Sequence, residues 1–258
     1  MSRLIFTFAI MTLSLTSLCS CRSTAPEAES TTTEPMPWVV DKFDDIKVLR
    51  YEVPGFEKLP LQQKTLIYYL AQATKAGRDI LFDQNFKYNL TVRRALEAIY
   101  TKYDGDRNAA EFKAMEKYLK KVWFANGIHH HYSNDKFAPE FSREWFAEQL
   151  KGVDTGAVSH EELVEIIFNP ALYASRLNQT AGVDMIAASA GNYYEGLTQA
   201  EVEKFYNKMI DPKDPRPISY GLNSKLVKKD GKIFEQTYKI GGMYTEALTQ
   251  VVYWLEKA

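Results

Sequence analysis

Histidines are the residues of this chain best suited to metal or acid–base chemistry, and there are four of them. His160 begins like the H-E-x-x-H zinc motif, in which two histidines one helical turn apart bind zinc and the Glu activates water. The fifth position is Val164, so the second ligand is missing. Ser159 and Glu162 instead form a capping pattern, which predicts that His160 lies in the exposed first turn of a helix.

The other three histidines are adjacent, at positions 129–131. Adjacent side chains point in different directions on any regular element, so at most two of these histidines could share one metal ion. A catalytic metal would also need convergent ligands supported by further hydrogen bonds. Three interpretations remain open. The triplet is a solvated loop, a cleft-lining loop in which histidine and Tyr132 touch a ligand, or a weak site for Ni, Cu or Zn.

Other signatures of catalysis are missing from the sequence, which contains no G-x-S-x-G, P-loop or dinucleotide fingerprint. Acidic pairs such as Asp44-Asp45 predict surface charge. The 32 basic and 33 acidic residues give a net charge of −1. This balance provides no basic excess for phosphate contacts and argues against a nucleic-acid partner. With 13% aromatic residues and two cysteines, the composition predicts a globular fold without a disulfide scaffold.

The N-terminus predicts a lipoprotein signal peptide over residues 1–20. Arg3 is followed by an apolar run that is too short for a typical membrane span. Cys21 follows Ser20, and Leu18 stands three residues before it, as in a bacterial lipobox. We therefore expect lipidation of Cys21, which would anchor the protein to the membrane of the bacterial cell envelope, at its periplasmic or outer-membrane face. An ordinary cleaved signal peptide and a buried N-terminal helix are the alternatives.

The remainder predicts an α+β fold that is predominantly helical with a small antiparallel β element. Residues 21–37 are rich in Ser, Thr, Glu and Pro, so they predict a flexible tether before a folded region over 38–258. Apolar residues recur at helical spacing in several segments. The predicted helices cover about 61–80, 92–103, 109–124 (with Asn108 as N-cap) and 243–258.

Turn and capping signals complete this outline. Capping patterns at Ser159 and Thr198 predict two more helices. Extended runs over 222–228 and 232–240 are joined through Asp230-Gly231, which predicts a β-hairpin. The last predicted helix is amphipathic and rich in aromatic residues, so we expect its apolar face to need a partner surface.

Five stretches of the sequence form a recognisable set: 49–56 (LRYEVPGF), 77–85 (GRDILFDQN), 122–132 (VWFANGIHHHY), 222–226 (LNSKL) and 240–244 (IGGMY). Together they resemble the N-terminal part of the bacterial zinc dipeptidyl peptidase III family, whose members release dipeptides from the free N-termini of oligopeptides. The similarity extends from about residue 41 to residue 258.

The resemblance implies a two-lobed peptidase, with a cleft between a helical zinc lobe and a lobe that contains a small β-barrel. The family's zinc site uses H-E-x-x-G-H and a Glu from a later helix, and neither motif occurs in these residues. We therefore expect the chain to be the N-terminal portion of such an enzyme, truncated before the zinc-binding motifs and inactive alone. It would have no catalytic or metal-binding residue and no cofactor of its own. Zinc and the oligopeptide substrate would belong to the full-length enzyme, whose C-terminal catalytic lobe is the missing partner.

One loop of the family carries over to this sequence. Residues 127–137 match a loop on the cleft wall that contains an aromatic residue. Tyr132 matches the aromatic position and His129 matches another, so the resemblance implies substrate contacts at both. The alternative function is that of a lipid-anchored, non-catalytic peptide-binding protein.

Overall fold

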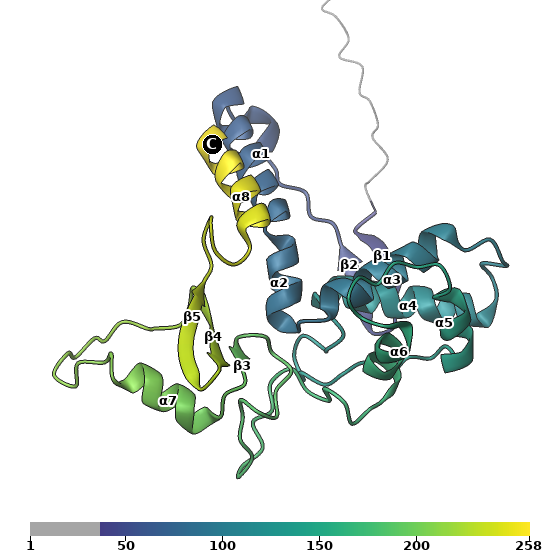
Figure 1. Cartoon of the computed structure of the whole chain (residues 1–258). Helices are drawn as coiled ribbons and strands as arrows, with labels where there is room; N and C mark the ends of the chain where they lie inside the picture. Colours follow the sequence, from purple (N-terminus) through teal and green to yellow (C-terminus); the bar gives the residue numbers. More distant parts are fainter. Residues whose placement is uncertain (1–36) are drawn as a thin grey trace, which may run out of the picture. The chain divides into compact units, whose positions relative to one another are not determined.

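The computed structural model describes residues 37–258, so the predicted signal peptide, Cys21 and the tether up to residue 36 lie outside the described residues. The fold is α+β and predominantly helical, as predicted, with small sheets that contain antiparallel pairs (Figure 1). Within residues 37–258, none of the helices combines the length and the apolar character needed to cross a bilayer.

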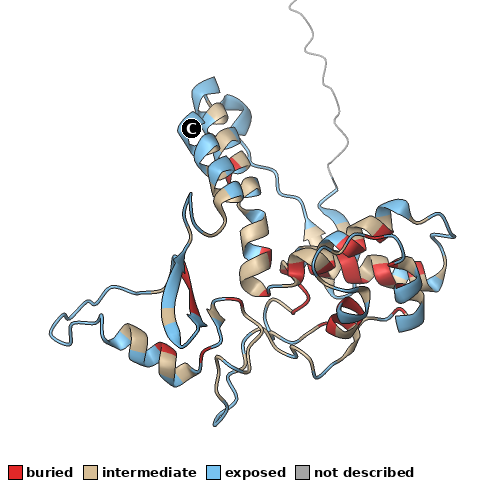
Figure 2. Ribbon diagram, in the orientation of Figure 1, coloured by how far each residue is buried: buried red, intermediate tan, exposed pale blue. Residues whose placement is uncertain are grey.

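The main hydrophobic core lies among α3 (Asn89–Lys102), α4 (Ala110–Ala125), α5 (Arg143–Gln149) and α6 (His160–Phe168). Apolar residues recur every three or four positions in α3, α4 and α6, so each of these helices buries one face. Figure 2 shows the buried residues concentrated on these elements. The largest side chains in this core are almost completely excluded from solvent: Phe82, Phe86, Phe112, Met115, Tyr118 and Phe146.

Two of the predicted helix caps are confirmed. The Ser159 hydroxyl accepts a hydrogen bond from the Glu162 backbone N–H at 3.1 Å and so begins α6. Thr198 begins α7 (Gln199–Asn207) with a complete capping box, in which Glu201 bonds back to the Thr198 backbone at 3.0 Å. Each bond satisfies a backbone donor that a helix N-terminus leaves free.

The predicted cap of α4 is wrong. Ala109 is the N-cap residue, and no side chain caps this helix. The carboxylate of Glu111 accepts hydrogen bonds from both the backbone N–H and the hydroxyl of Ser142, each at 2.8 Å. Because Ser142 caps α5, Glu111 joins two helices and is not available to close a capping box with Asn108.

The segment 61–80, predicted as one helix, forms two. α1 (Leu61–Ala76) ends before Gly77, and α2 (Arg78–Asn85) follows directly. Glycine costs about 1 kcal/mol relative to alanine inside a helix, which favours an interruption at this position. α2 was not predicted as a separate element, although its Phe82 is fully buried in the main core.

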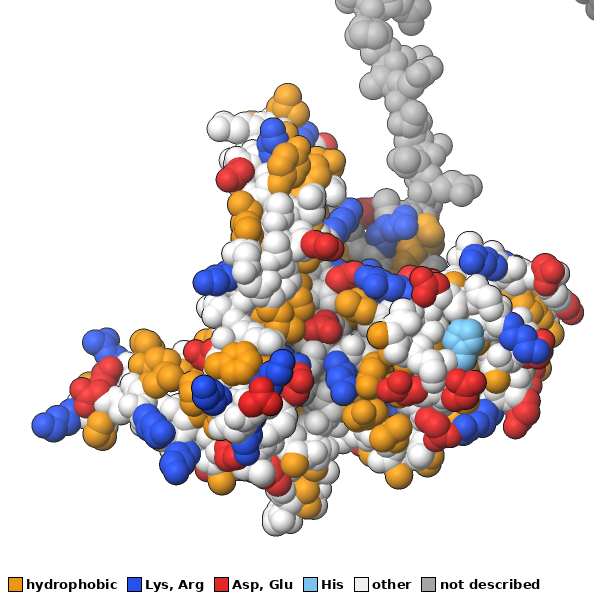
Figure 3. Space-filling model, in the orientation of Figure 1, with side chains coloured by type: hydrophobic (Ala, Val, Ile, Leu, Met, Phe, Trp, Pro, Cys, Tyr) orange, Lys and Arg blue, Asp and Glu red, His pale blue; other side chains and the backbone are white. Residues whose placement is uncertain are grey.

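The C-terminal helix α8 (Thr245–Lys257) lies alongside α1 (Figure 1). Tyr69 of α1 stacks on Trp254 of α8, with their ring centroids 6.0 Å apart. Ala73 is the one buried residue of α1, and α8 has none among its described side chains. Apolar side chains therefore reach the surface of this pair, and Figure 3 shows hydrophobic side chains exposed there. The exposed apolar residues of the two helices include Leu61, Leu66, Ile67, Tyr68, Leu70, Val252, Tyr253 and Leu255.

The predicted hairpin is confirmed as β4 (Ser224–Lys229) and β5 (Lys232–Thr237), which pair in antiparallel register. Asp230 and Gly231 both have positive φ, 52° and 74°, as the tight turn between twisted strands requires. A short β3 (Tyr194–Glu195) adds to β4 in parallel. Val202 of α7 packs with Leu226 of β4 in a second, smaller core.

A second antiparallel pair was not predicted. It consists of β1 (Val39–Phe43) and β2 (Ile46–Leu49), and a short 3-10 helix, η1 (Phe56–Lys58), follows it. Asp44, in the turn between the strands, forms an ion pair with Lys121 of α4. The acidic pair predicted as surface charge thus contributes one carboxylate to a contact with the helical core.

Candidate functional site

The segment 127–137, which we call the histidine loop, begins directly after α4. The side chain of Asn89, fully buried at the start of α3, fixes this beginning. Its amide nitrogen donates to the Phe82 carbonyl at 3.0 Å, and its amide oxygen accepts the Ile128 backbone N–H at 3.0 Å. A Cβ on Gly127 would lie 2.1 Å from the Asn89 amide nitrogen, so glycine is required here. The start of the loop is therefore locked to α2 and α3.

His129 lies in the core and not on the surface. Its side chain is 2% exposed, and Nε2 lies 2.8 Å from the Tyr173 carbonyl, to which it donates. The ring also makes an edge-to-face contact with Phe86, at 5.6 Å between centroids. Burial lowers the pKa of His129 to about 4, so the ring is neutral at physiological pH. Its Nδ1 has no hydrogen-bond partner in the described part of the chain. In this position the side chain of His129 anchors the histidine loop to the core. Its expected substrate contact stays a prediction.

The side-chain rings of the next three residues lie against one another, and one pair of them is stacked. Nδ1 of His130 accepts the backbone N–H groups of Tyr132, at 3.2 Å, and Ser133, at 3.1 Å. The His130 and His131 rings stack with centroids 4.5 Å apart, and the Tyr132 ring lies 4.2 Å from His131. Burial, followed by the neighbouring His130, lowers the pKa of His131. Tyr132 is 83% exposed, so the loop presents this aromatic side chain to solvent.

Arg176 holds the other side of the loop. Its Nε and Nη2 donate to the side-chain oxygen of Asn134 at 3.0 and 2.8 Å, and Nη2 also reaches the His131 carbonyl at 3.4 Å. Nη1 donates to the side-chain oxygen of Asn85, at the end of α2, at 3.2 Å. The Arg176 backbone N–H donates to the Asn134 carbonyl at 2.8 Å. One guanidinium therefore connects the histidine loop to α2.

These three polar residues open onto a cavity of about 450 Å³, which we call the Arg176 cavity. Tyr193 and Tyr194 also line it, and its remaining wall is mainly apolar. A small cavity with apolar walls and a few fixed polar groups is typical of sites that bind small ligands. The other lining residues are Leu177, Met185, Ile186, Ser189 and Gly191.

Lys136, near the end of the loop, has a structural role. Its ammonium donates to the carbonyls of Ile166 at 3.1 Å and Leu172 at 2.6 Å, and also to that of Asn169. These contacts satisfy carbonyl groups at and just after the C-terminus of α6, where a cation is favourable. Burial lowers the pKa of Lys136.

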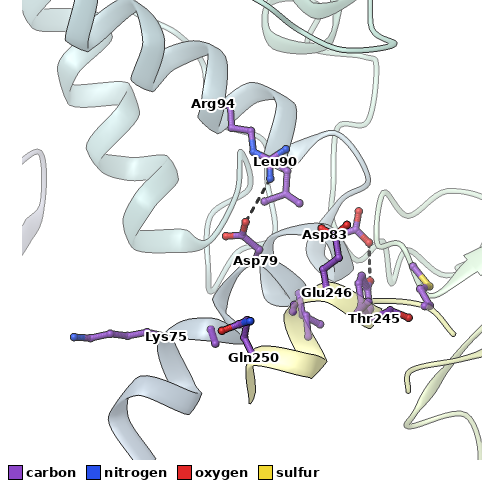
Figure 4. A pocket seen from close by; sticks show the side chains of 13 residues that line it. Lys75, Asp79, Asp83, Leu90, Arg94, Thr245, Glu246 and Gln250 are labelled. Carbon is purple, nitrogen blue, oxygen red and sulfur yellow. Dashed lines mark hydrogen bonds and ion pairs between the residues drawn. The ribbon is translucent and has the colours of Figure 1, made fainter. Parts of the chain in front are cut away.

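A larger cavity, of about 770 Å³, lies among α1, α2, α3 and α8 (Figure 4). Its two most enclosed carboxylates already have partners. Asp79 pairs with Arg93 at 2.8 Å and Arg94 at 3.5 Å. Asp83 accepts the Tyr244 hydroxyl at 2.6 Å and the Asn192 amide at 3.0 Å. The dashed lines in Figure 4 mark such contacts. These carboxylates join α2 to its neighbours.

The described residues do not fit a zinc site. Among residues 37–258, no group of three or more His, Cys, Asp or Glu side chains is placed to hold a metal ion. His160 is half-buried, and not exposed as expected, because its Nε2 bonds to the Val153 carbonyl at 2.9 Å.

Comparison with known proteins adds no assignment: no protein-family model matches this chain, and no curated protein matches it.

Proposed function

We propose that this chain forms one wall of the peptide-binding cleft of a zinc-dependent dipeptidyl peptidase III-like metallopeptidase. Such an enzyme removes dipeptides from the N-terminus of oligopeptides. The observation that carries the proposal is the histidine loop, in which Tyr132 is 83% exposed on a backbone fixed at both sides beside the Arg176 cavity. In this proposal the chain is the N-terminal portion, anchored to the bacterial cell envelope by a lipid on Cys21. Zinc and the catalytic lobe come from the rest of the full-length enzyme.

Rigid support of the loop favours a role in binding. A loop held in one conformation pays little conformational entropy when a ligand binds to it. Asn89 fixes the start of the histidine loop and Arg176 fixes its middle. The loop's own His129 is buried in the core. The exposed ring of Tyr132 then offers apolar area and a hydroxyl to a peptide, a combination that is common at binding surfaces.

A second candidate function is that of a lipid-anchored peptide-binding protein without catalysis. It is favoured by the completeness of the loop and its cavity within the described residues, together with the absence of H-E-x-x-G-H from the sequence. Both functions require peptide binding at the histidine loop. They differ in whether a catalytic lobe acts on the bound peptide.

Titration calorimetry with the peptide Ala-Phe-Ala-Ala tests peptide binding at the histidine loop, which both candidate functions require. We expect the Tyr132→Ala variant to bind it about tenfold more weakly than the unmodified protein, because aromatic contact area is lost. Tyr51→Ala is the matched control, because Tyr51 is also exposed, at 75%, but lies between β2 and η1. Equal weakening in both variants, or none in either, would contradict a binding role for the loop.

A dipeptidyl-arylamide assay with added zinc tests whether the isolated chain is inactive. We expect the isolated chain to show no hydrolysis above a control without protein, because it has no H-E-x-x-G-H motif. Turnover above that control would refute the expected inactivity.

A further inference from the structure

We propose that the Arg176 cavity is a carboxylate-binding site in which Arg176 is the anion anchor. This inference rests on the proposed function, from which it takes the class of ligand, a short peptide. The carboxylate is either the C-terminus of that peptide or an acidic side chain within it.

The charge of Arg176 is not balanced by a neighbouring carboxylate. Its four side-chain hydrogen bonds all end on neutral oxygens, those of two Asn side chains and one backbone carbonyl. Among the described residues, no carboxylate lies within 4.0 Å of its guanidinium. Removing a cation from water is costly when no anion compensates it, so a half-buried Arg176 favours an anionic ligand.

Other arginines of the chain show the contrast. Arg93, Arg94 and Arg143 each pair with a carboxylate. Arg107 bonds to backbone carbonyls, as Arg176 does in part, but these are the carbonyls of Tyr100 and Tyr103 at the C-terminal end of α3, where a cation is favourable. Arg176 therefore combines a charge without a carboxylate partner with a place on a cavity wall.

One N–H group of the Arg176 guanidinium is free to bind a ligand. A guanidinium has five N–H groups. In Arg176, Nε uses its single N–H, Nη2 uses both of its own, and Nη1 uses one, which leaves one free on Nη1. Tyr193 lines the same cavity, is 40% exposed, and its hydroxyl bonds to no other group in the described part of the chain. A carboxylate in this cavity could accept a hydrogen bond from the free N–H of Arg176, and Tyr193 offers a second donor on the same cavity wall.

The guanidinium of Arg176 is held in a fixed orientation. Asn134 and Asn85 hold it from two sides, so its free N–H is set before a ligand arrives. Binding then requires little reorganisation. The apolar wall formed by Leu177, Met185 and Ile186 suits the carbon atoms that adjoin a carboxylate in a peptide.

Three peptides test the site by calorimetry with the full chain: Ala-Phe-Ala-Ala as the free acid, the same peptide as its C-terminal amide, and the amide Ala-Phe-Glu-Ala. We expect the free acid to bind at least about tenfold more tightly than its amide, because a charge-assisted hydrogen bond is lost in the amide. If the Glu-containing amide binds as tightly as the free acid, the site accepts an acidic side chain as well. If it binds as weakly as the first amide, the site is specific for a C-terminus. Both results support a carboxylate site.

Arg176→Gln removes the charge and keeps an amide that can donate to Asn134. We expect it to abolish the difference between acid and amide, whereas the control Arg107→Gln, with the same change in net charge, keeps the difference. If Arg176→Gln fails to fold by circular dichroism, Tyr193→Phe replaces it, because it removes only a hydroxyl; we then expect the difference to shrink by about threefold or more. Equal binding of all three peptides would overturn the carboxylate site and leave peptide binding intact. Binding of none would overturn both.

Discussion

Acidification from pH 6.5 to pH 4 is expected to lower the free energy of unfolding by roughly 3 kcal/mol through His129 alone. Burial holds the pKa of His129 at about 4 in the folded chain, whereas the unfolded chain protonates it near 6.5. Between these values the unfolded state binds more protons than the folded state. Stability contributed by the neutral ring is therefore complete above pH 6.5 and is lost as the pH falls towards 4.

Urea unfolding at a series of pH values measures this loss. Carboxylates also titrate in this range, so the informative quantity is the difference between the unmodified protein and His129→Gln. Glutamine keeps an amide N–H for the Tyr173 carbonyl and does not titrate. We expect the variant to have a shallower pH dependence than the unmodified protein. Identical slopes for the two proteins would contradict the burial of His129.

Replacing Gly127 by alanine is expected to destabilise the protein by about 3 kcal/mol or more. The new Cβ would lie 2.1 Å from the Asn89 amide nitrogen, and Gly127 has a φ of 149°, which side chains disfavour. Asn89 would have to move, and its bonds to Phe82 and Ile128 would break inside the core. We expect the substitution to lower the stability of the protein and to displace the histidine loop.

Gly156→Ala is the matched control for this substitution. Gly156 also has a positive φ, of 64°, but a Cβ there would meet no atom within 4 Å. We expect only the backbone cost of about 1–2 kcal/mol at this position. Equal destabilisation of the two variants in thermal or urea unfolding would show that the contact with Asn89 has no energetic consequence.

The regular elements were largely predictable because their signals are local. The hairpin turn at Asp230-Gly231 and the caps at Ser159 and Thr198 depend on residues within a few positions of one another. Asn108 failed as a cap because Glu111 is bound by Ser142, which is 31 residues away in sequence. No local pattern contains that contact.

The candidate site was predictable only in part. The sequence singled out His129 and Tyr132, but it could not show that one is buried and the other exposed, because both lie in the same irregular loop. Asn89 and Arg176 were missed because their contacts are long-range. Their partners lie 39 and 42 residues away in sequence, at Ile128 and Asn134, and chain folding alone brings them together.

Photocrosslinking tests the central claim, peptide binding at the histidine loop, most directly. A tetrapeptide that carries benzoylphenylalanine would be irradiated with the full chain, and the adducts would be located by mass spectrometry. We expect adducts within residues 127–137 and 176–194, with competition by unlabelled Ala-Phe-Ala-Ala. Adducts confined to the exposed apolar side chains of α1 and α8, such as Ile67 and Tyr253, would contradict it.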